Sequence, residues 1–250
     1  MLDLCNEKTP LALDVTKEAG VRIAAQIAAY GFEQPFFLVY QGESGSVLSI
    51  LDGAATLLAG EDVDEVFCFL HMSPQVTSLR TDGETAAAFA AAYGMKAKAG
   101  AVLKAPPRIQ PTGDAKEITP AAYYPLAKRV FGESMPPFDA WYADVTHRLR
   151  RDKCRLVAVY DGDVPVSGGM TVAEAESAWL LGAICTDEHY RKRGYAAACV
   201  TALASAGQAL GKDVFIAAKN EGAQRLYESL GFTVCGTWGQ VDFLENEGTV

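Results

Sequence analysis

The sequence predicts a mixed α/β fold of the α+β kind, and three observations support that prediction. Half of the 250 residues are apolar and 21% are charged, which is the balance of a folded globular chain. Short apolar segments bounded by turn residues alternate with longer segments of helical spacing. A proline-rich stretch at 106–114 separates two parts that both have this alternation. We therefore expect α/β domains at 1–105 and 115–250, joined by a linker at 106–114.

The elements of the second part follow from its turns and helix breakers. The turn at 161–163 separates two strands, and Gly211 ends a long alanine-rich helix. Asn220 and Gly231 begin and end a shorter helix. The expected elements are helices at 121–130, 138–151, 195–210 and 220–230, and strands at 155–160, 164–173, 179–186, 214–218, 233–238 and 241–244. The last two strands are expected to form a hairpin.

The first part repeats a piece of this order more faintly. Its expected elements are a helix at 15–30, strands at 36–40, 47–59 and 65–71, and a helix at 85–93. The run of strand, turn, strand, strand and helix matches the run at 155–210, so we expect an internal duplication. A chance likeness between two α/β segments remains the alternative.

The charge balance excludes two classes of partner. The chain carries 22 basic and 31 acidic residues, a net charge of −9. The part up to Gln110 has 8 basic and 13 acidic residues, and the rest has 14 and 18. Nucleic acids and anionic membrane surfaces select for basic proteins, so we expect neither as a partner. A cationic small substrate would suit this charge.

Cysteine and histidine usage gives no sign of a metal site. No two of the six cysteines form a C-x-x-C pair, and the three histidines stand apart from one another. Scattered cysteines are typical of a reducing compartment. The acidic start at 1–4 does not resemble a secretory signal, and no apolar run reaches the roughly 20 residues of a membrane span. We expect a cytoplasmic protein without a metal.

A glycine-containing basic loop at 191–196 carries the clearest chemical signal. It lies between an expected strand and the long helix, and it has the pattern Arg191-x-x-Gly194-x-Ala196. The first backbone N–H groups of a helix have no partner within the helix and attract anions. Small residues there let a pyrophosphate approach the backbone, and basic side chains add charge for its oxygens. The alternative is a solvated run of charges.

A second motif makes the first one specific. After the long helix and one strand, the segment at 220–232 reads N-x-x-A-x-x-x-Y-x-x-x-G-F. Together the two motifs resemble the signatures of the GNAT acyltransferase superfamily, whose members transfer acyl groups from acyl-coenzyme A to amines. The matching positions are Arg191, Gly194, Ala196, Asn220, Ala223, Tyr227, Gly231 and Phe232. The resemblance covers about 114–244. It implies the GNAT fold there, and a tandem in which the first copy is degenerate.

The resemblance implies a set of coenzyme A contacts. In the family the strand before the loop diverges from its neighbour, and the acyl-pantetheine arm enters the gap. A bulge at Gly182 would help to open that gap, although a plain packing glycine is the alternative. Asn220 matches an asparagine that contacts coenzyme A, and it also suits a helix N-cap. The expected cofactor-binding residues are Ile184, Cys185, Thr186, Arg191, Lys192, Arg193, Gly194, Tyr195, Ala196 and Asn220.

The catalytic groups are matched only in part. Tyr227 matches the usual general acid of the family, with a core aromatic as the alternative. The glutamate that the family often places on the strand before the loop is missing from 179–186. Glu133, Glu174 and Glu176 are candidates for the base, and each is also explained as a solvated charge. Deprotonation of the amine through water is the default.

The function that follows is transfer of an acetyl group from acetyl-coenzyme A to a primary amine of a small molecule or peptide, by direct attack. The alternative is a non-catalytic acyl-coenzyme A-binding or regulatory protein on the same fold. The sequence does not name the amine, because fold does not fix the substrate. In the first part, the segment at 72–83 lacks the loop motif and contains Pro74. We therefore expect that part to have lost coenzyme A binding.

Overall fold

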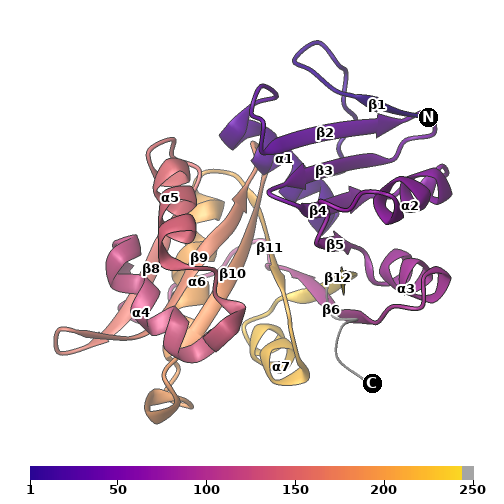
Figure 1. The fold of residues 1–250 in the computed structure, drawn as a ribbon. Helices are drawn as coiled ribbons and strands as arrows, with labels where there is room; N and C mark the ends of the chain where they lie inside the picture. Colours follow the sequence, from indigo (N-terminus) through magenta and orange to yellow (C-terminus); the bar gives the residue numbers. More distant parts are fainter. Residues whose placement is uncertain (244–250) are drawn as a thin grey trace. The chain divides into compact units, whose positions relative to one another are not determined.

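The computed structural model describes residues 1–243. The chain divides into two compact units (Figure 1). Unit 1 contains residues 1–102 together with 235–243, and unit 2 contains residues 103–234. No helix of the described residues is long and apolar enough to cross a membrane.

This division differs from the expected domains 1–105 and 115–250 in two respects. The segment at 106–114 is an integral part of unit 2 rather than a free linker. The Gln208 side chain accepts a hydrogen bond from the N–H of Ile109 (2.9 Å) and donates one to the carbonyl of Pro106 (2.6 Å). The hydroxyl of Thr201 accepts one from the N–H of Thr112 (3.0 Å). The second difference is that the end of the chain, from Cys235 on, belongs to unit 1.

Unit 1 is a sheet with helices on both faces. Its elements are β1 (Leu2–Leu4), α1 (Glu18–Tyr30), β2 (Phe37–Gly42), β3 (Val47–Leu51), β4 (Ala54–Leu58), α2 (Val63–His71), β5 (Ser78–Thr81), α3 (Gly83–Ala92), β6 (Ala97–Lys104) and the part of β12 (Thr233–Asp242) after Val234. The strand order is β1-β2-β3-β4-β5-β12-β6. β4 and β5 are parallel, and β12 pairs with β5 in the antiparallel sense.

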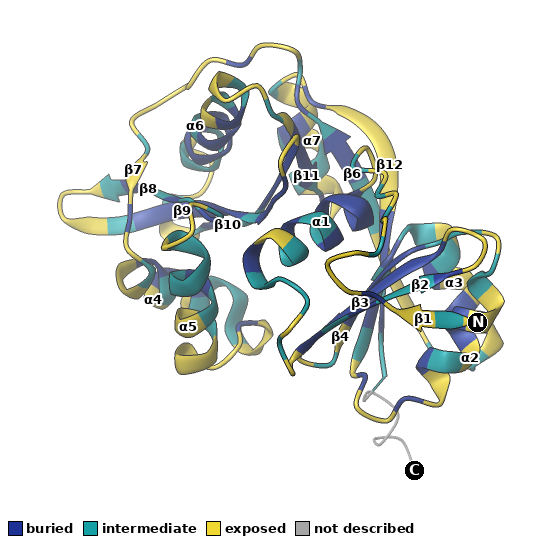
Figure 2. Cartoon of the chain, turned by 90° about the horizontal axis from the view of Figure 1, so that it is seen from above, coloured by how far each residue is buried: buried dark blue, intermediate teal, exposed yellow. Residues whose placement is uncertain are grey.

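The two cores of unit 1 follow from the alternation of side chains along its strands. Figure 2 shows α1 on one face of the sheet and α2 and α3 on the other. In β3, Val47 packs on the α1 side, while Leu48 packs against α2 and α3. Ser49 faces α1 again, and its hydroxyl donates to the Gln26 side chain (2.7 Å). Successive side chains along a strand therefore pack into opposite cores.

Several expectations for unit 1 were wrong in detail. The strand expected at 65–71 is the helix α2, which buries Val66, Phe67 and Leu70 at helical spacing. The strand expected at 47–59 is a hairpin of β3 and β4, because Asp52 and Gly53 both have positive φ, as a two-residue hairpin turn requires. β5 and β6 were not expected at all.

Unit 2 has the expected elements up to residue 232, and one short strand that was not expected, β7 (Lys116–Glu117). The expected elements are α4 (Pro120–Phe131), α5 (Phe138–Leu149), β8 (Leu156–Asp161), β9 (Val164–Glu174), β10 (Ala178–Thr186), α6 (Tyr195–Ala209), β11 (Asp213–Ala217) and α7 (Glu221–Ser229). The strand order is β11-β10-β9-β8-β7. Helices α4 and α5 cover one face of β8, β9 and β10, and α6 covers the other (Figure 2).

The hairpin expected at 233–244 is instead one strand, β12, as far as it is described; residue 244 lies outside the described residues. Gly239 lies between the two expected strands, and the structure shows why a glycine stands there. A Cβ at Gly239 would lie 2.4 Å from the side chain of Ala86, so glycine allows β12 to pass close to α3.

The two units share one order of elements: helix, three strands, helix, strand, helix; in unit 2 a further helix, α4, precedes this run. The run of β2, β3, β4 and α2 in unit 1 corresponds to β8, β9, β10 and α6 in unit 2. A repeated order was expected from the sequence. The structure places the counterpart of the basic loop at 59–62, between β4 and α2, rather than at 72–83.

Candidate functional site

The strands β10 and β11 part midway along unit 2. They pair in parallel from Ala178 with Asp213 to Leu181 with Ile216, and residues 182–186 have no partner on β11. On its other edge β10 stays paired with β9 as far as Thr186. One edge of β10 beyond Leu181 therefore offers backbone N–H and C=O groups to an extended ligand.

A bulge lies at the point where the strands part. Gly182 pairs with Met170 and Cys185 with Gly168, so β10 has one residue more than β9 over this interval. Ala183 is in the left-handed region with φ 48°. The expected bulge is thus present directly after Gly182. A Cβ at Gly182 would lie 2.7 Å from the Val172 side chain, so this glycine also permits close packing.

The start of α6 is open to an anion. Gly194 precedes the helix in the left-handed conformation with φ 81°, and no side chain caps the helix. The first hydrogen bond within the helix runs from the N–H of Ala198 to the carbonyl of Gly194 (3.0 Å). The first turn contains no acidic residue. The N–H groups of Tyr195 and Ala196 therefore have no partner within the helix, and they carry the positive end of its dipole.

A pocket of about 570 Å³ joins the free edge of β10 to the start of α6. It collects nine of the ten residues expected to bind the cofactor, namely Ile184, Cys185, Thr186, Arg191, Lys192, Gly194, Tyr195, Ala196 and Asn220. Arg193 is not among the lining residues: its guanidinium lies 5.1 Å from the centre of the Tyr190 ring and donates to the carbonyl of His189 (3.3 Å). Ala223, a position of the second motif, also lines the pocket. So do five residues that the sequence did not single out: Val130, Tyr190, Ala197, Gly222 and Leu226.

Asn220 directly precedes α7, and its side chain can make two kinds of contact. Its side-chain oxygen accepts a hydrogen bond from the N–H of Ala223 (2.9 Å), which makes it the N-cap of α7. Asn220 also lines the pocket. Its capping bond leaves the amide NH₂ group to donate to a ligand.

Tyr227 lies on α7 but does not line the pocket. The side chain is 95% buried and packs against Phe232, with ring centres 6.2 Å apart. Burial raises the pKa of the Tyr227 hydroxyl to about 12. The phenol is therefore protonated at neutral pH and can act there as a hydrogen-bond donor.

None of the three candidate bases lines the pocket. Glu174 is buried and pairs with Arg155, and the hydroxyl of Thr171 donates to it (2.6 Å). Glu133 is fully exposed beside Lys128 (3.3 Å), and Glu176 is exposed. Within residues 1–243, no group of three His, Cys, Asp or Glu side chains could hold a metal ion.

Comparison with known proteins gives a family and a fold. Residues 118–232 match the model of the acetyltransferase (GNAT) family. No curated protein matches the chain.

Solved structures resemble the chain over nearly its whole length. A GCN5-related N-acetyltransferase from Kribbella flavida has a TM-score of 0.61 at 17% identity, over 89% of this chain and 96% of that one. An acetyltransferase of the GNAT family from Colwellia psychrerythraea has a TM-score of 0.58 at 13% identity, over 97% and 99%. A tandem GNAT protein of the clavulanic acid biosynthesis pathway has a TM-score of 0.55 at 16% identity, over 96% and 98%. At these identities the likeness establishes the fold.

Proposed function

Residues 118–232 belong to the GNAT acetyltransferase family, and from that premise we propose that the protein is an acyl-coenzyme A-dependent N-acetyltransferase. It transfers the acetyl group of acetyl-coenzyme A to a primary amine of a small molecule or peptide. The observation that carries the proposal is the parting of β10 and β11 beside the uncapped start of α6, with one pocket joining them.

The pocket offers a separate surface to each part of the cofactor. The pantetheine arm is a chain of amides, and it pairs with the free backbone edge at 184–186 as an added strand would. The pyrophosphate lies at the N–H groups that begin α6, with Arg191 and Lys192 supplying positive charge. A Cβ at Gly194 would project into space that is otherwise open to the pyrophosphate, so glycine keeps the approach to these N–H groups clear.

The chemistry is attack of a neutral amine on the thioester carbonyl. The new C–N bond forms, the C–S bond breaks, coenzyme A leaves as a thiolate, and the nitrogen loses a proton. No carboxylate is among the residues that line the pocket, so water carries this proton away. We assign to Tyr227 a hydrogen bond to the leaving sulfur, which requires that its hydroxyl, next in sequence to the lining residue Leu226, reach the pocket when acetyl-coenzyme A is bound. A phenol with a pKa of about 12 holds its proton more tightly than a thiol with a pKa of about 8.5, so full transfer to sulfur is uphill.

A non-catalytic acyl-coenzyme A-binding protein is the second candidate. The absence of a carboxylate from the pocket lining and the buried position of Tyr227 favour it. Whichever candidate holds, we propose a cytoplasmic location, because none of the six cysteines, all within the described residues, forms a disulfide bond.

One experiment separates the two candidates. The full chain is incubated with acetyl-coenzyme A and a panel of primary amines, and free thiol is measured over time. An N-acetyltransferase releases thiol in proportion to one or more amines, with an acetylated amine of equal amount in the product. Binding of acetyl-coenzyme A by calorimetry without amine-dependent thiol release identifies the non-catalytic protein. If acetyl-coenzyme A does not bind, both candidate functions are wrong.

A further inference from the structure

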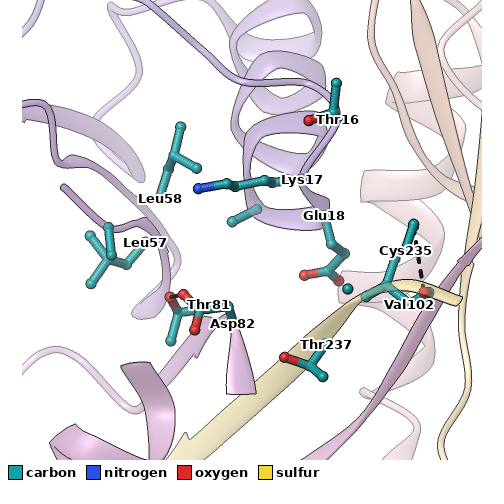
Figure 3. Close-up of a pocket in the computed structure, with 13 residues that line it drawn as sticks. Thr16, Lys17, Glu18, Leu57, Leu58, Thr81, Asp82, Val102, Cys235 and Thr237 are labelled. Carbon is teal, nitrogen blue, oxygen red and sulfur yellow. Dashed lines mark hydrogen bonds between the residues drawn. The ribbon is translucent and has the colours of Figure 1, made fainter. Parts of the chain in front are cut away.

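Unit 1 has a pocket at the place where its own strands part. β4 and β5 pair in parallel from Ala54 with Ser78 to Thr56 with Arg80, and the pairing ends there. This repeats the arrangement of β10 and β11 in unit 2. A pocket of about 250 Å³ follows the last pair, and residues of α1, β4, β5, β6 and β12 line it (Figure 3).

The part of unit 1 that corresponds to the start of α6 does not suit a phosphate. The residues that lead into α2 and form its first turn are acidic: Glu61, Asp62, Asp64 and Glu65. The carboxylate of Asp62 accepts hydrogen bonds from the N–H groups of Ser44 (2.9 Å) and Ser46 (3.1 Å). No residue of α2 lines the pocket. The start of α2 therefore presents negative charge where α6 presents free N–H groups, and it would repel a diphosphate. Coenzyme A is for this reason a poor candidate for unit 1.

Two acidic side chains at the pocket already have partners. Glu18 is buried, and its carboxylate accepts from the guanidinium groups of Arg22 and Arg80, the latter at 2.9 Å. These two arginines hold the pKa of the Glu18 carboxyl below its usual value despite its burial. Asp82 caps α3 and accepts from both the N–H (2.9 Å) and the hydroxyl (2.7 Å) of Thr85.

The remaining lining combines an apolar surface with one positive charge. Leu58 packs on the α1 side of the sheet, and Leu58 and Val102 both line the pocket. Figure 3 shows the Lys17 side chain stretched across the pocket toward Leu57 and Leu58. No ion pair of Lys17 is found within the described part of the chain. An ammonium group beside an apolar surface matches an anionic head joined to an apolar body.

We propose that this pocket binds a small organic anion, a monocarboxylate with a short apolar chain. The carboxylate pairs with Lys17, and the chain lies on Leu58 and Val102. The volume of about 250 Å³ equals the share of on the order of eight water molecules, which suits a short-chain acid and is too small for a coenzyme. The site is separate from the proposed acetyl-coenzyme A pocket, which lies wholly in unit 2.

The probe for the test is 3-methylbutanoate, and its neutral control is 3-methylbutanamide, which has the same shape. Binding of each to the full chain is measured by ligand-detected NMR titration. We expect the acid to bind and the amide to bind at least several-fold more weakly. Lys17→Gln should weaken binding of the acid about three- to fivefold, the range for an exposed ion pair. Lys96→Gln removes an exposed lysine of the same unit outside the pocket, and it should leave binding unchanged.

A second variant fills the pocket. Gly236 lines it, and a Cβ at this position would meet no atom within 4 Å. Gly236→Val should therefore abolish binding of 3-methylbutanoate with little change in melting temperature. Equal binding of acid and amide, or equal losses in Lys17→Gln and Lys96→Gln, would overturn the proposal. So would full binding in Gly236→Val. Acetyl-coenzyme A titrations on the same samples keep this result separate from the fate of the proposed function.

Discussion

The hydroxyl group of Tyr123 donates a hydrogen bond to the backbone carbonyl of Ala183, the residue with positive φ at the bulge of β10. Tyr123 lies on α4 and is completely buried. Its oxygen also lies 3.7 Å from the sulfur of Cys185. One side chain thus joins α4 to the segment of β10 that leaves β11, and it fixes the direction of the free strand edge.

Tyr123→Phe should loosen that edge. The change leaves the partly buried carbonyl of Ala183 without its donor, which costs about 1–3 kcal/mol of unfolding free energy. The Kd for acetyl-coenzyme A should rise as the bulge relaxes. Tyr124→Phe is the matched control, because Tyr124 also donates to a backbone carbonyl, that of Pro136 (2.7 Å), away from β10. Urea unfolding and calorimetric titration measure both effects. Equal behaviour of the two variants would contradict the role of Tyr123.

Ala196→Leu should block the start of α6 without harming the helix. Ala196 lies in the first turn of α6 and lines the pocket, so a larger side chain projects toward the expected pyrophosphate. Loss of two charge-assisted hydrogen bonds, at about 1.5–3 kcal/mol each, weakens binding of coenzyme A by on the order of a hundredfold or more. Ala206→Leu changes an exposed alanine of the same helix and serves as control. Calorimetry should find the loss in Ala196→Leu alone, and similar affinities in both variants would exclude this site for the pyrophosphate.

Gly194→Val is a poorer probe of the same site. A β-branched side chain at this position would stand between the first N–H groups of α6 and the pyrophosphate. With φ at 81°, however, a β-branched residue is strained before any ligand arrives. A loss of affinity in that variant would therefore mix the two effects.

Trp238→Ala should destabilise unit 1, although Trp238 lies near the end of the chain. The ring is 6% exposed and stacks under the Arg80 guanidinium at 4.1 Å. Removing a buried tryptophan costs about 3–5 kcal/mol. Val234→Ala, on the same strand but 51% exposed, is the control and should cost little. Hydrogen exchange should quicken in β5 and α3 in the tryptophan variant, and unchanged exchange there would show that β12 is dispensable to unit 1.

The elements that the sequence predicted well are those with clear breakers. Gly211, Asn220 and Gly231 mark the ends of α6 and α7, and the structure has them at those ends. The five apolar residues at 66–70 suit a buried strand and a helix equally, and the choice of a strand was wrong. The pairing of β12 with β5 joins segments more than 150 residues apart, and no local sequence pattern predicts it.

The two pockets differ in how far the sequence could predict them. Most residues of the unit 2 pocket stand in two compact motifs, so their spacing was enough to group them, while Val130 on α4 has no motif. Spacing could not tell that the Arg193 side chain lies against Tyr190 or that Tyr227 lies outside the lining, because side-chain direction decides both. The unit 1 pocket is built from five separate elements without a motif, and only the folded chain brings them together.

Alkaline pH should destabilise the protein through buried thiols in unit 2. Burial raises the pKa of Cys154 and Cys185 to about 11 and that of Cys199 to about 12. In the unfolded chain these thiols lose their protons near pH 9, while the native state keeps them protonated. The unfolded state therefore binds fewer protons between about pH 9 and 12, and unfolding free energy falls as pH rises through that range.

The expected loss is about 1 kcal/mol for each of these thiols at pH 10, relative to pH 7. The urea midpoint measured from pH 7 to 10.5 should stay level up to about pH 8.5 and then fall. Cys154→Ala removes one of the three groups and should make the fall shallower by about a third. A midpoint that does not change up to pH 10.5 would mean that these thiols are not buried as described.

Tyr227→Phe tests the proposed donor to the leaving sulfur. The phenylalanine keeps the packing against Phe232, so the loss of unfolding free energy should not exceed about 1 kcal/mol. Affinity for acetyl-coenzyme A should be nearly unchanged, because Tyr227 does not line the pocket. General acid help is worth about 10²–10⁴-fold, and a phenol whose pKa is raised to about 12 is a weak acid, so we expect kcat to fall by about 10²-fold. Since this hydroxyl stays protonated up to about pH 12, wild-type kcat should show no loss from it at pH 9–10. Steady-state kinetics on any accepted amine give kcat, a coenzyme A titration gives the affinity, and thermal melting gives the stability. If kcat is retained and only stability falls, Tyr227 is a core residue, and water delivers the proton to the sulfur.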